Sequence, residues 1–121
     1  MATRRDLELL LKHLGRAFAP HPRDPDALLV AATLPSDEPV TLRIDAPQLT
    51  ARLRIADAAS LDGVTMRRML VLNTQMLVMA SFGVRGDDAV LEGSLPLARL
   101  EIAELGALLA EMDLVRGEAL A

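Results

Sequence analysis

The fold of this chain depends on one stretch, Leu70-Val71-Leu72-Asn73-Thr74-Gln75-Met76-Leu77-Val78-Met79-Ala80-Ser81-Phe82-Gly83-Val84. The stretch is almost entirely apolar, but Asn73, Thr74 and Gln75 interrupt it, so it is too short and too polar to span a membrane. Its pattern predicts the end of a helix, a tight polar corner, and a strand buried on both faces. We expect Leu77 and Phe82 to be buried in this strand, at the centre of the fold.

Further strands lie on both sides of this stretch. After it, Arg85-Gly86-Asp87-Asp88 is typical of a tight turn, and Ala89–Gly93 predicts a returning strand. Before it, strands are expected at 27–32, 40–44 and 49–55. In the last two, apolar and polar residues alternate, which predicts an antiparallel hairpin with one apolar face.

Three helices complete the pattern. Thr3 can cap a first helix, whose apolar stripe is Leu7, Leu10, Leu11, Leu14 and Phe18, and which Pro20 ends. Asp62 can cap a second helix over about 64–72. The last helix begins near Leu97 or Arg99, with the stripe Ile102, Leu105, Leu108, Leu109, Met112 and Val115.

These elements predict one α+β domain over residues 1–121, with an antiparallel sheet covered by helices. The expected order is helix, three strands, helix, two strands, helix. A chain of 121 residues is long enough to bury a core. Because Phe18 and Phe82 are its only aromatic residues, that core must consist of aliphatic side chains and methionines.

The composition excludes several classes of chemistry. There is no cysteine, so disulfides, zinc–thiolate sites and thiol catalysis are impossible. None of the serines lies in a Gly-x-Ser-x-Gly elbow, and the glycines are too scattered to cradle a phosphate. His13 and His21 lack a third ligand at useful spacing, and a hairpin turn explains Asp87-Asp88 better than a cation loop. We therefore expect no enzyme, no metal and no cofactor.

The distribution of charged residues indicates the cellular compartment and the kind of partner to expect. Asp6, Glu8 and Lys12 interrupt the N-terminal segment, which therefore lacks the uncharged apolar run of a signal peptide. With no cysteine, this favours the cytoplasm. The net charge is −4, and acidic residues predominate after Gly86, which argues against nucleic-acid binding.

Two surfaces are candidates for partner binding. Met66 and Met69 belong to a methionine cluster that suits an adaptable binding surface, although it also suits a core without aromatics. We expect a homodimer through this second helix. Arg43, Arg52 and Arg54 should share one sheet face, where they meet a partner's carboxylates, internal acids or solvent. The internal candidates are Asp45, Asp57 and the acids of the last helix.

The element order resembles the fold of class I type III secretion chaperones, and the stretch 40–97 resembles the YjfI-type bacterial family. The similar motifs are Met79-Ala80-Ser81-Phe82-Gly83-Val84 and Leu91-Glu92-Gly93-Ser94-Leu95. The resemblance implies a non-enzymatic protein-binding chaperone or adaptor in a membrane-stress system of the phage-shock-protein-A type. Its contact with membranes would then be peripheral, through that partner. A type III secretion chaperone holding an effector segment and a small-molecule binding domain are the alternatives.

Overall fold

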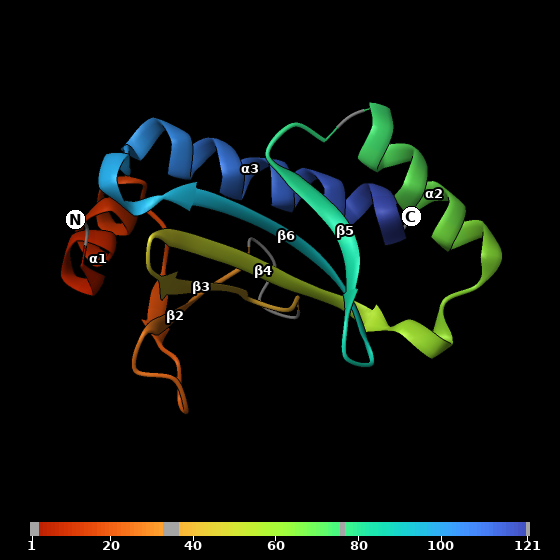
Figure 1. Cartoon of the computed structure of the whole chain (residues 1–121), viewed down its shortest axis with the longest axis horizontal. Coiled ribbons are helices and arrows are strands. Elements are labelled where there is room, and N and C mark those ends of the chain that lie inside the picture. Colours follow the sequence, from red (N-terminus) through yellow and green to blue (C-terminus); the bar gives the residue numbers. More distant parts are fainter. Residues whose placement is uncertain (1–2, 33–36, 76, 121) are drawn as a thin grey trace.

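A computed structural model describes residues 3–32, 37–75 and 77–120 (Figure 1). Its elements in chain order are α1 (Arg4–His13), β1 (Phe18–Pro20), β2 (Ala27–Val30), β3 (Val40–Asp45), β4 (Gln48–Asp57), the 3-10 turn η1 (Ala58–Ser60), α2 (Gly63–Gln75), β5 (Ala80–Arg85), β6 (Asp88–Pro96), the 3-10 turn η2 (Leu97–Arg99) and α3 (Ile102–Leu120). Six strands form one antiparallel sheet in the order β1-β2-β3-β4-β6-β5. The predicted α+β class is confirmed.

One strand was not expected. The first helix was predicted to continue to Phe18, but it ends at His13, and Gly15 then turns the chain with φ +69°. Arg16 N–H bonds to Leu11 O across this turn. Phe18–Pro20 is therefore free to pair with β2 as a short edge strand, which adds one strand to the predicted order.

The prediction of a central strand in the 70–84 stretch is wrong. Asn73 to Gln75 form the last turn of α2 rather than a corner after the helix, and Met76 lies outside the described residues. Leu77 is half-buried in the loop that follows. The strand begins at Ala80 and lies at the edge of the sheet, where only Ala80 and Phe82 are buried. The longest strand pair, inside the sheet, is instead formed by β4 and β6, which pair along almost their whole length.

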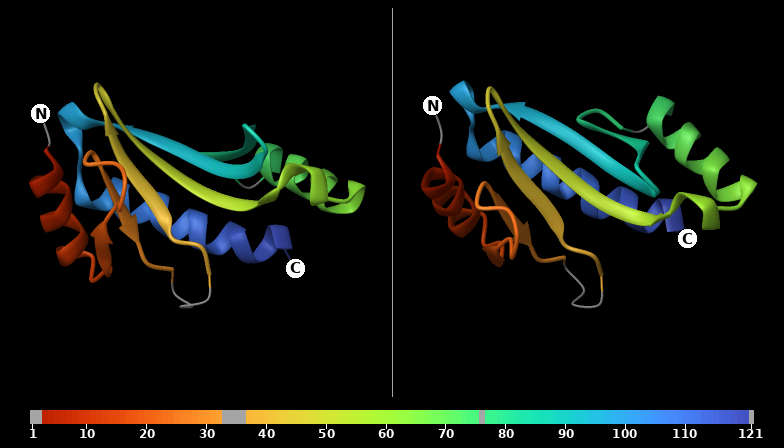
Figure 2. Two further views of the ribbon diagram at one scale, coloured as in Figure 1. Left: turned by 90° about the horizontal axis from the view of Figure 1, so that it is seen from below. Right: turned by 60° about the horizontal axis from the view of Figure 1, so that its bottom comes forward.

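The core lies on one face of the sheet. All three helices contribute to the same buried cluster, so they lie on the same side of the strands, and Figure 2 shows α3 running along that side. The predicted stripe of α3 is buried except for Ile102, which is exposed. The sheet contributes Leu28, Leu42, Leu49, Leu53 and Leu91, each less than 2% exposed.

Both predicted helix caps are present. Thr3 and Asp6 form a reciprocal capping box at the start of α1. Asp62 Oδ1 accepts a hydrogen bond of 2.7 Å from Thr65 N–H at the start of α2. These contacts satisfy N–H groups that have no partner within the helix.

Candidate functional site on the open face of the sheet

The face of the sheet opposite the core is polar, because alternate residues of β3, β4 and β6 point away from the helices. Two cross-strand rows show this alternation. Thr41, Arg52 and Glu92 are paired neighbours in one row, and Arg43, Thr50 and Ser94 are paired neighbours in the next. We call this surface the open face.

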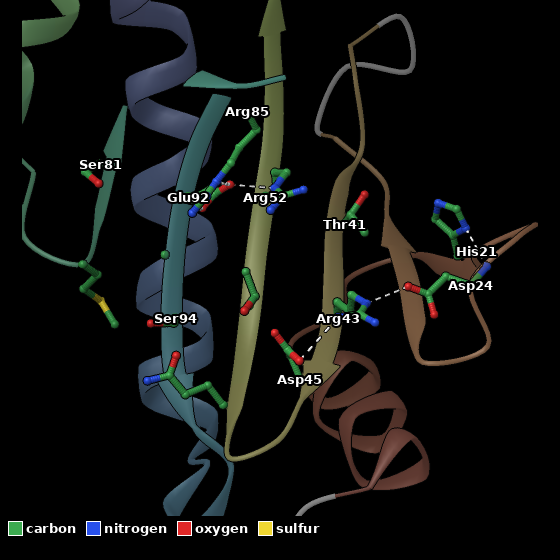
Figure 3. A pocket seen from close by; sticks show the side chains of 14 residues that line it. His21, Asp24, Thr41, Arg43, Asp45, Arg52, Ser81, Arg85, Glu92 and Ser94 are labelled. Atoms are coloured by element: carbon green, nitrogen blue, oxygen red, sulfur yellow. Dashed lines mark hydrogen bonds and ion pairs between the residues drawn. The ribbon is translucent and has the colours of Figure 1, made fainter. Parts of the chain in front are cut away.

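The open face is hollowed into a groove of about 920 Å³ (Figure 3). Thr50 and Ser94 contribute hydroxyls to its lining, together with arginines and carboxylates. His21 lines the groove on one side and Ser81 on the other, so the groove extends from the loop between β1 and β2 to β5. The groove joins residues that are more than seventy positions apart in the printed sequence.

One charged cluster centres on Glu92. Arg52 Nε donates to Glu92 Oε1 at 2.7 Å, and Arg85 donates to both oxygens, through Nε at 2.9 Å and Nη2 at 3.1 Å. Hydrogen bonding from Arg85 and the charge of Arg52 hold the pKa of Glu92 below its ordinary value, against the effect of partial burial. Two guanidinium groups thus share one carboxylate, and the cluster carries a net positive charge.

A second cluster at the opposite side of the groove has the opposite sign. Arg43 Nε donates to Asp24 Oδ2 at 2.8 Å, and its Nη1 lies 3.5 Å from Asp45 Oδ1. The pKa of Asp24 is lowered first by the N–H of Asp26 and then by Arg43. One guanidinium faces two carboxylates here, so the cluster is net negative.

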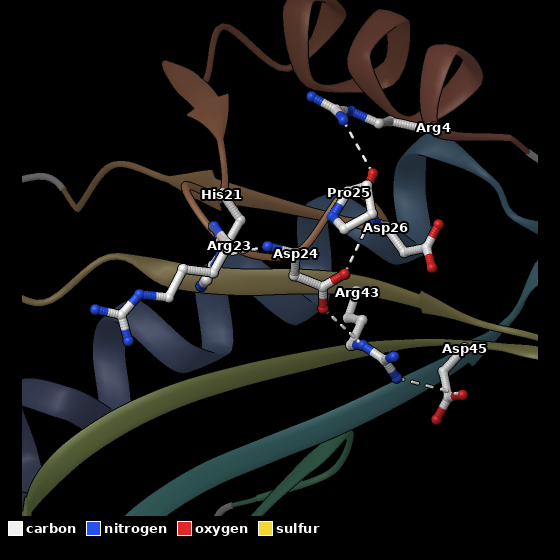
Figure 4. A network of polar contacts seen from close by, with 8 residues as sticks. All are labelled: Arg4, His21, Arg23, Asp24, Pro25, Asp26, Arg43 and Asp45. Carbon is white, nitrogen blue, oxygen red and sulfur yellow. Dashed lines mark hydrogen bonds and ion pairs between the residues drawn. The ribbon is translucent and has the colours of Figure 1, made fainter.

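The loop that carries Asp24 is held in place by its own contacts (Figure 4). His21 Nδ1 accepts hydrogen bonds from the N–H groups of Arg23 and Asp24, at 3.0 and 3.1 Å. Arg4 of α1 donates to Pro25 O at 2.9 Å. His21 therefore positions Asp24 at the rim of the groove, a role that the sequence did not indicate.

The third predicted arginine, Arg54, lies on the same face but outside the groove lining. It donates to Asp57 at 2.6 Å and to Asp88 at 3.0 Å. The expectation that the three arginines share one face is thus confirmed, as is pairing with Asp45 and Asp57. Pairing with acids of the last helix is wrong, because α3 covers the opposite face.

Two acids of α3 bond to other parts of the chain. Asp113 pairs with Arg16 at 2.7 Å. Glu111 accepts hydrogen bonds from the N–H groups of Val78, Met79 and Ala80.

The two candidate methionines of α2 lie in different environments. Met69 is buried in the core, so its assignment to a partner surface is wrong, whereas Met66 is 47% exposed. Besides Met66, α2 and the neighbouring β5 region leave five further large apolar side chains exposed: Val64, Leu70, Val71, Val78 and Val84. We call these six residues the apolar end. The sequence indicated an apolar helix here, but not which side of it faced outward.

The described residues contain no group of three or more His, Asp or Glu side chains that could hold a metal ion. Within the same residues, every helix is too short or too polar to cross a bilayer.

No family model and no curated protein sequence matches this chain. Its fold is similar to the crystal structure of YbjN from E. coli, described there as a proposed transcription regulator. The similarity covers 98% of this chain and 90% of YbjN, with a TM-score of 0.60 and 13% sequence identity. At that identity the likeness concerns the fold alone.

Proposed function

We propose that this chain is a non-enzymatic protein-binding adaptor or chaperone. Its partner docks in the groove of the open face, and two copies of the chain associate through the apolar end. The observation that carries the proposal is the groove itself, a broad hollow in a sheet face opposite all three helices, lined by charged groups of both signs.

The two charged clusters define the chemistry of the partner. A segment with an acidic group near Arg52 and a basic group near Asp24 would complement the groove at both sides. Among the described contacts, Arg52 uses Nε for Glu92, which leaves its terminal nitrogens as donors for a carboxylate. A small molecule fits this surface less well, because small-molecule sites are mostly apolar and bury most of the ligand.

The resemblance to the YjfI-type family supports a proposal about the cellular system in which the chain acts. We infer that the partner belongs to a membrane-stress system of the phage-shock-protein-A type. The chain would then meet the membrane only through that partner.

The groove can be tested by charge removal. We expect the variant with both Arg43→Ser and Arg52→Ser to lose a partner that the unchanged protein captures from its native host. Capture should weaken as salt is added, because exposed charge contacts are screened. Arg99→Ser is the matched control, since Arg99 is exposed and does not line the groove. Equal capture by both variants, identified by mass spectrometry, would contradict the role of the open face.

The apolar end supports a second copy as its occupant. Only Met69 and Leu72 of α2 are buried, so most of its apolar side chains have no cover in the described chain. The helix contains Arg67 and Arg68 but no acidic residue, whereas the exposed Glu118 lies near the end of the adjacent α3. A two-fold arrangement that brings α2 of one copy to α3 of the other would pair Arg67 with Glu118 and cover Leu70.

Sedimentation velocity tests this association. Leu70→Glu should give monomers, whereas Leu9→Glu should not, because the exposed Leu9 lies on α1 at the opposite end of the molecule. Arg67→Glu should weaken the dimer, and adding Glu118→Arg should restore it. An unchanged protein that sediments as a monomer at high concentration would overturn the dimer while leaving the groove proposal standing.

A further inference from the structure

The two edge strands of the sheet, β1 and β5, are kept from pairing with a further strand in different ways. At the β1 edge, Ala31 N–H donates to Ala17 O and His21 N–H donates to Ala27 O. The main-chain groups of Phe18 and Pro20 therefore face outward, where Pro20 has no N–H to offer. A short strand with an outward proline is a poor template for another strand.

The β5 edge has no proline and is closed by a side chain. Phe82 is paired with Leu91 of β6, and its own N–H and C=O point to the free side. Asn73, in the last turn of α2, occupies both groups. Phe82 N–H donates to Asn73 Oδ1 at 2.7 Å, and Asn73 Nδ2 donates to Phe82 O at 3.2 Å. One carboxamide thus makes the pair of bonds that a residue of a neighbouring strand would make.

A second side chain bonds to the main chain just before β5 and at its first residue. Glu111 of α3 accepts hydrogen bonds at 2.9 Å from Val78 N–H and at 3.3 Å from Ala80 N–H. The edge is therefore occupied at Ala80 and at Phe82. Neither Asn73 nor Glu111 lines the groove or is one of the residues of the apolar end.

We propose that Asn73 is an autoinhibitory lock on a strand-acceptor edge, and that the strand this edge accepts when unlocked is β5 of a second copy. Antiparallel pairing centred on Phe82 would exchange the same N–H and C=O groups that Asn73 now occupies. It would place Ala80 opposite Val84 and Met79 opposite Arg85, so no like charges face each other. Since α2 is anchored by two buried side chains, its last turn can leave the edge without unfolding the sheet.

The test uses Asn73→Ala in a chain that also carries Leu70→Glu, so that association through the apolar end does not contribute. We expect the amide of Phe82 to exchange with solvent about tenfold faster at low concentration, because its partner is gone. At higher concentration the variant should associate, and the Phe82 amide should regain protection. Thr74→Ala is the matched control, because the hydrogen bonds of Thr74 within the described residues go to Leu70 O and Val71 O of the same helix.

A synthetic peptide with the sequence of residues 79–85 identifies the acceptor directly. It should bind the Asn73→Ala variant and not the chain with Asn73 intact, and a scrambled peptide should bind neither. Asn73→Ser provides a second variant if alanine impairs folding, because a single hydroxyl cannot make both bonds. Unchanged exchange at Phe82 would overturn the lock. Faster exchange without self-association or peptide binding would overturn the acceptor edge and leave Asn73 a structural residue.

Discussion

Gly93 lies directly beneath Leu108, where α3 crosses β6. A Cβ atom added at position 93 would be 2.6 Å from Leu108 Cδ1 and 2.8 Å from Met79 O. The absence of a side chain at this position therefore lets α3 approach β6 closely. It also lets the loop before β5 approach β6.

This close approach predicts a cost for Gly93→Ala. Because one of the obstructing atoms is a main-chain oxygen, rotation of Leu108 alone cannot relieve the contact. We expect a loss of about 1–3 kcal/mol in the free energy of unfolding, measured by urea denaturation. Gly83→Ala is the control, since no heavy atom lies within 4 Å of a Cβ there, and its effect should be clearly smaller. Equal effects at both positions would contradict the packing described.

The position of β6 inside the sheet predicts a contrast between two leucines. Leu91 is fully buried in β6, whereas Leu77 is half-buried in a loop. Leu91→Ala should lower the free energy of unfolding by about 2–5 kcal/mol. Leu77→Ala should cost less than half as much, because its site is partly solvated and can relax. Thermal and urea unfolding of both variants would check the order, and a larger loss at Leu77 would refute it.

The orientation of α2 predicts opposite outcomes at neighbouring positions. Met69→Glu places a carboxylate among the apolar side chains of the core, where its charge is poorly solvated. It should lose several kcal/mol of stability or fail to fold. Leu70→Glu should keep the melting temperature of the monomer nearly unchanged, because Leu70 is 66% exposed. Circular dichroism melting of the two proteins distinguishes these outcomes, and similar melting curves would show that the helix is turned differently.

The carboxylate shared by two arginines predicts a pH dependence. The pKa of Glu92 lies below its ordinary value of 4.5, so its stabilising effect is present above about pH 4.5. The effect is lost as the pH falls through the lower pKa of the folded state, because the unfolded chain then binds the proton more tightly. Glu92→Gln should be less stable at pH 7 and lose less stability on acidification. Its stability curve should approach that of the unchanged protein at low pH, as followed by urea unfolding from pH 7 to 3. Parallel curves would contradict this role of Glu92.

The sequence alone determined the fold class and the polarity of the sheet faces. The alternation from Val40 to Ile55 dictated which side chains face the core, because successive side chains of a strand point to opposite faces. It therefore placed Arg43 and Arg52 on one outer face. The caps at Thr3 and Asp62 followed from local chemistry, since a cap involves residues only three positions apart.

The tertiary structure decided which strands are neighbours. An apolar run such as Leu77–Val84 has the same composition at the centre of a sheet and at its edge when a helix covers it. Because β6 pairs with β4, β5 can pair only on the outer side of β6 and becomes the edge strand, where Asn73 bonds to Phe82. The partners of the arginines were fixed in the same way, because Arg52 and Glu92 are 40 positions apart and meet only through strand register. The periodicity of the sequence specifies which face of the sheet a side chain lies on. Its neighbours on adjacent strands depend on the strand order and register of the folded chain.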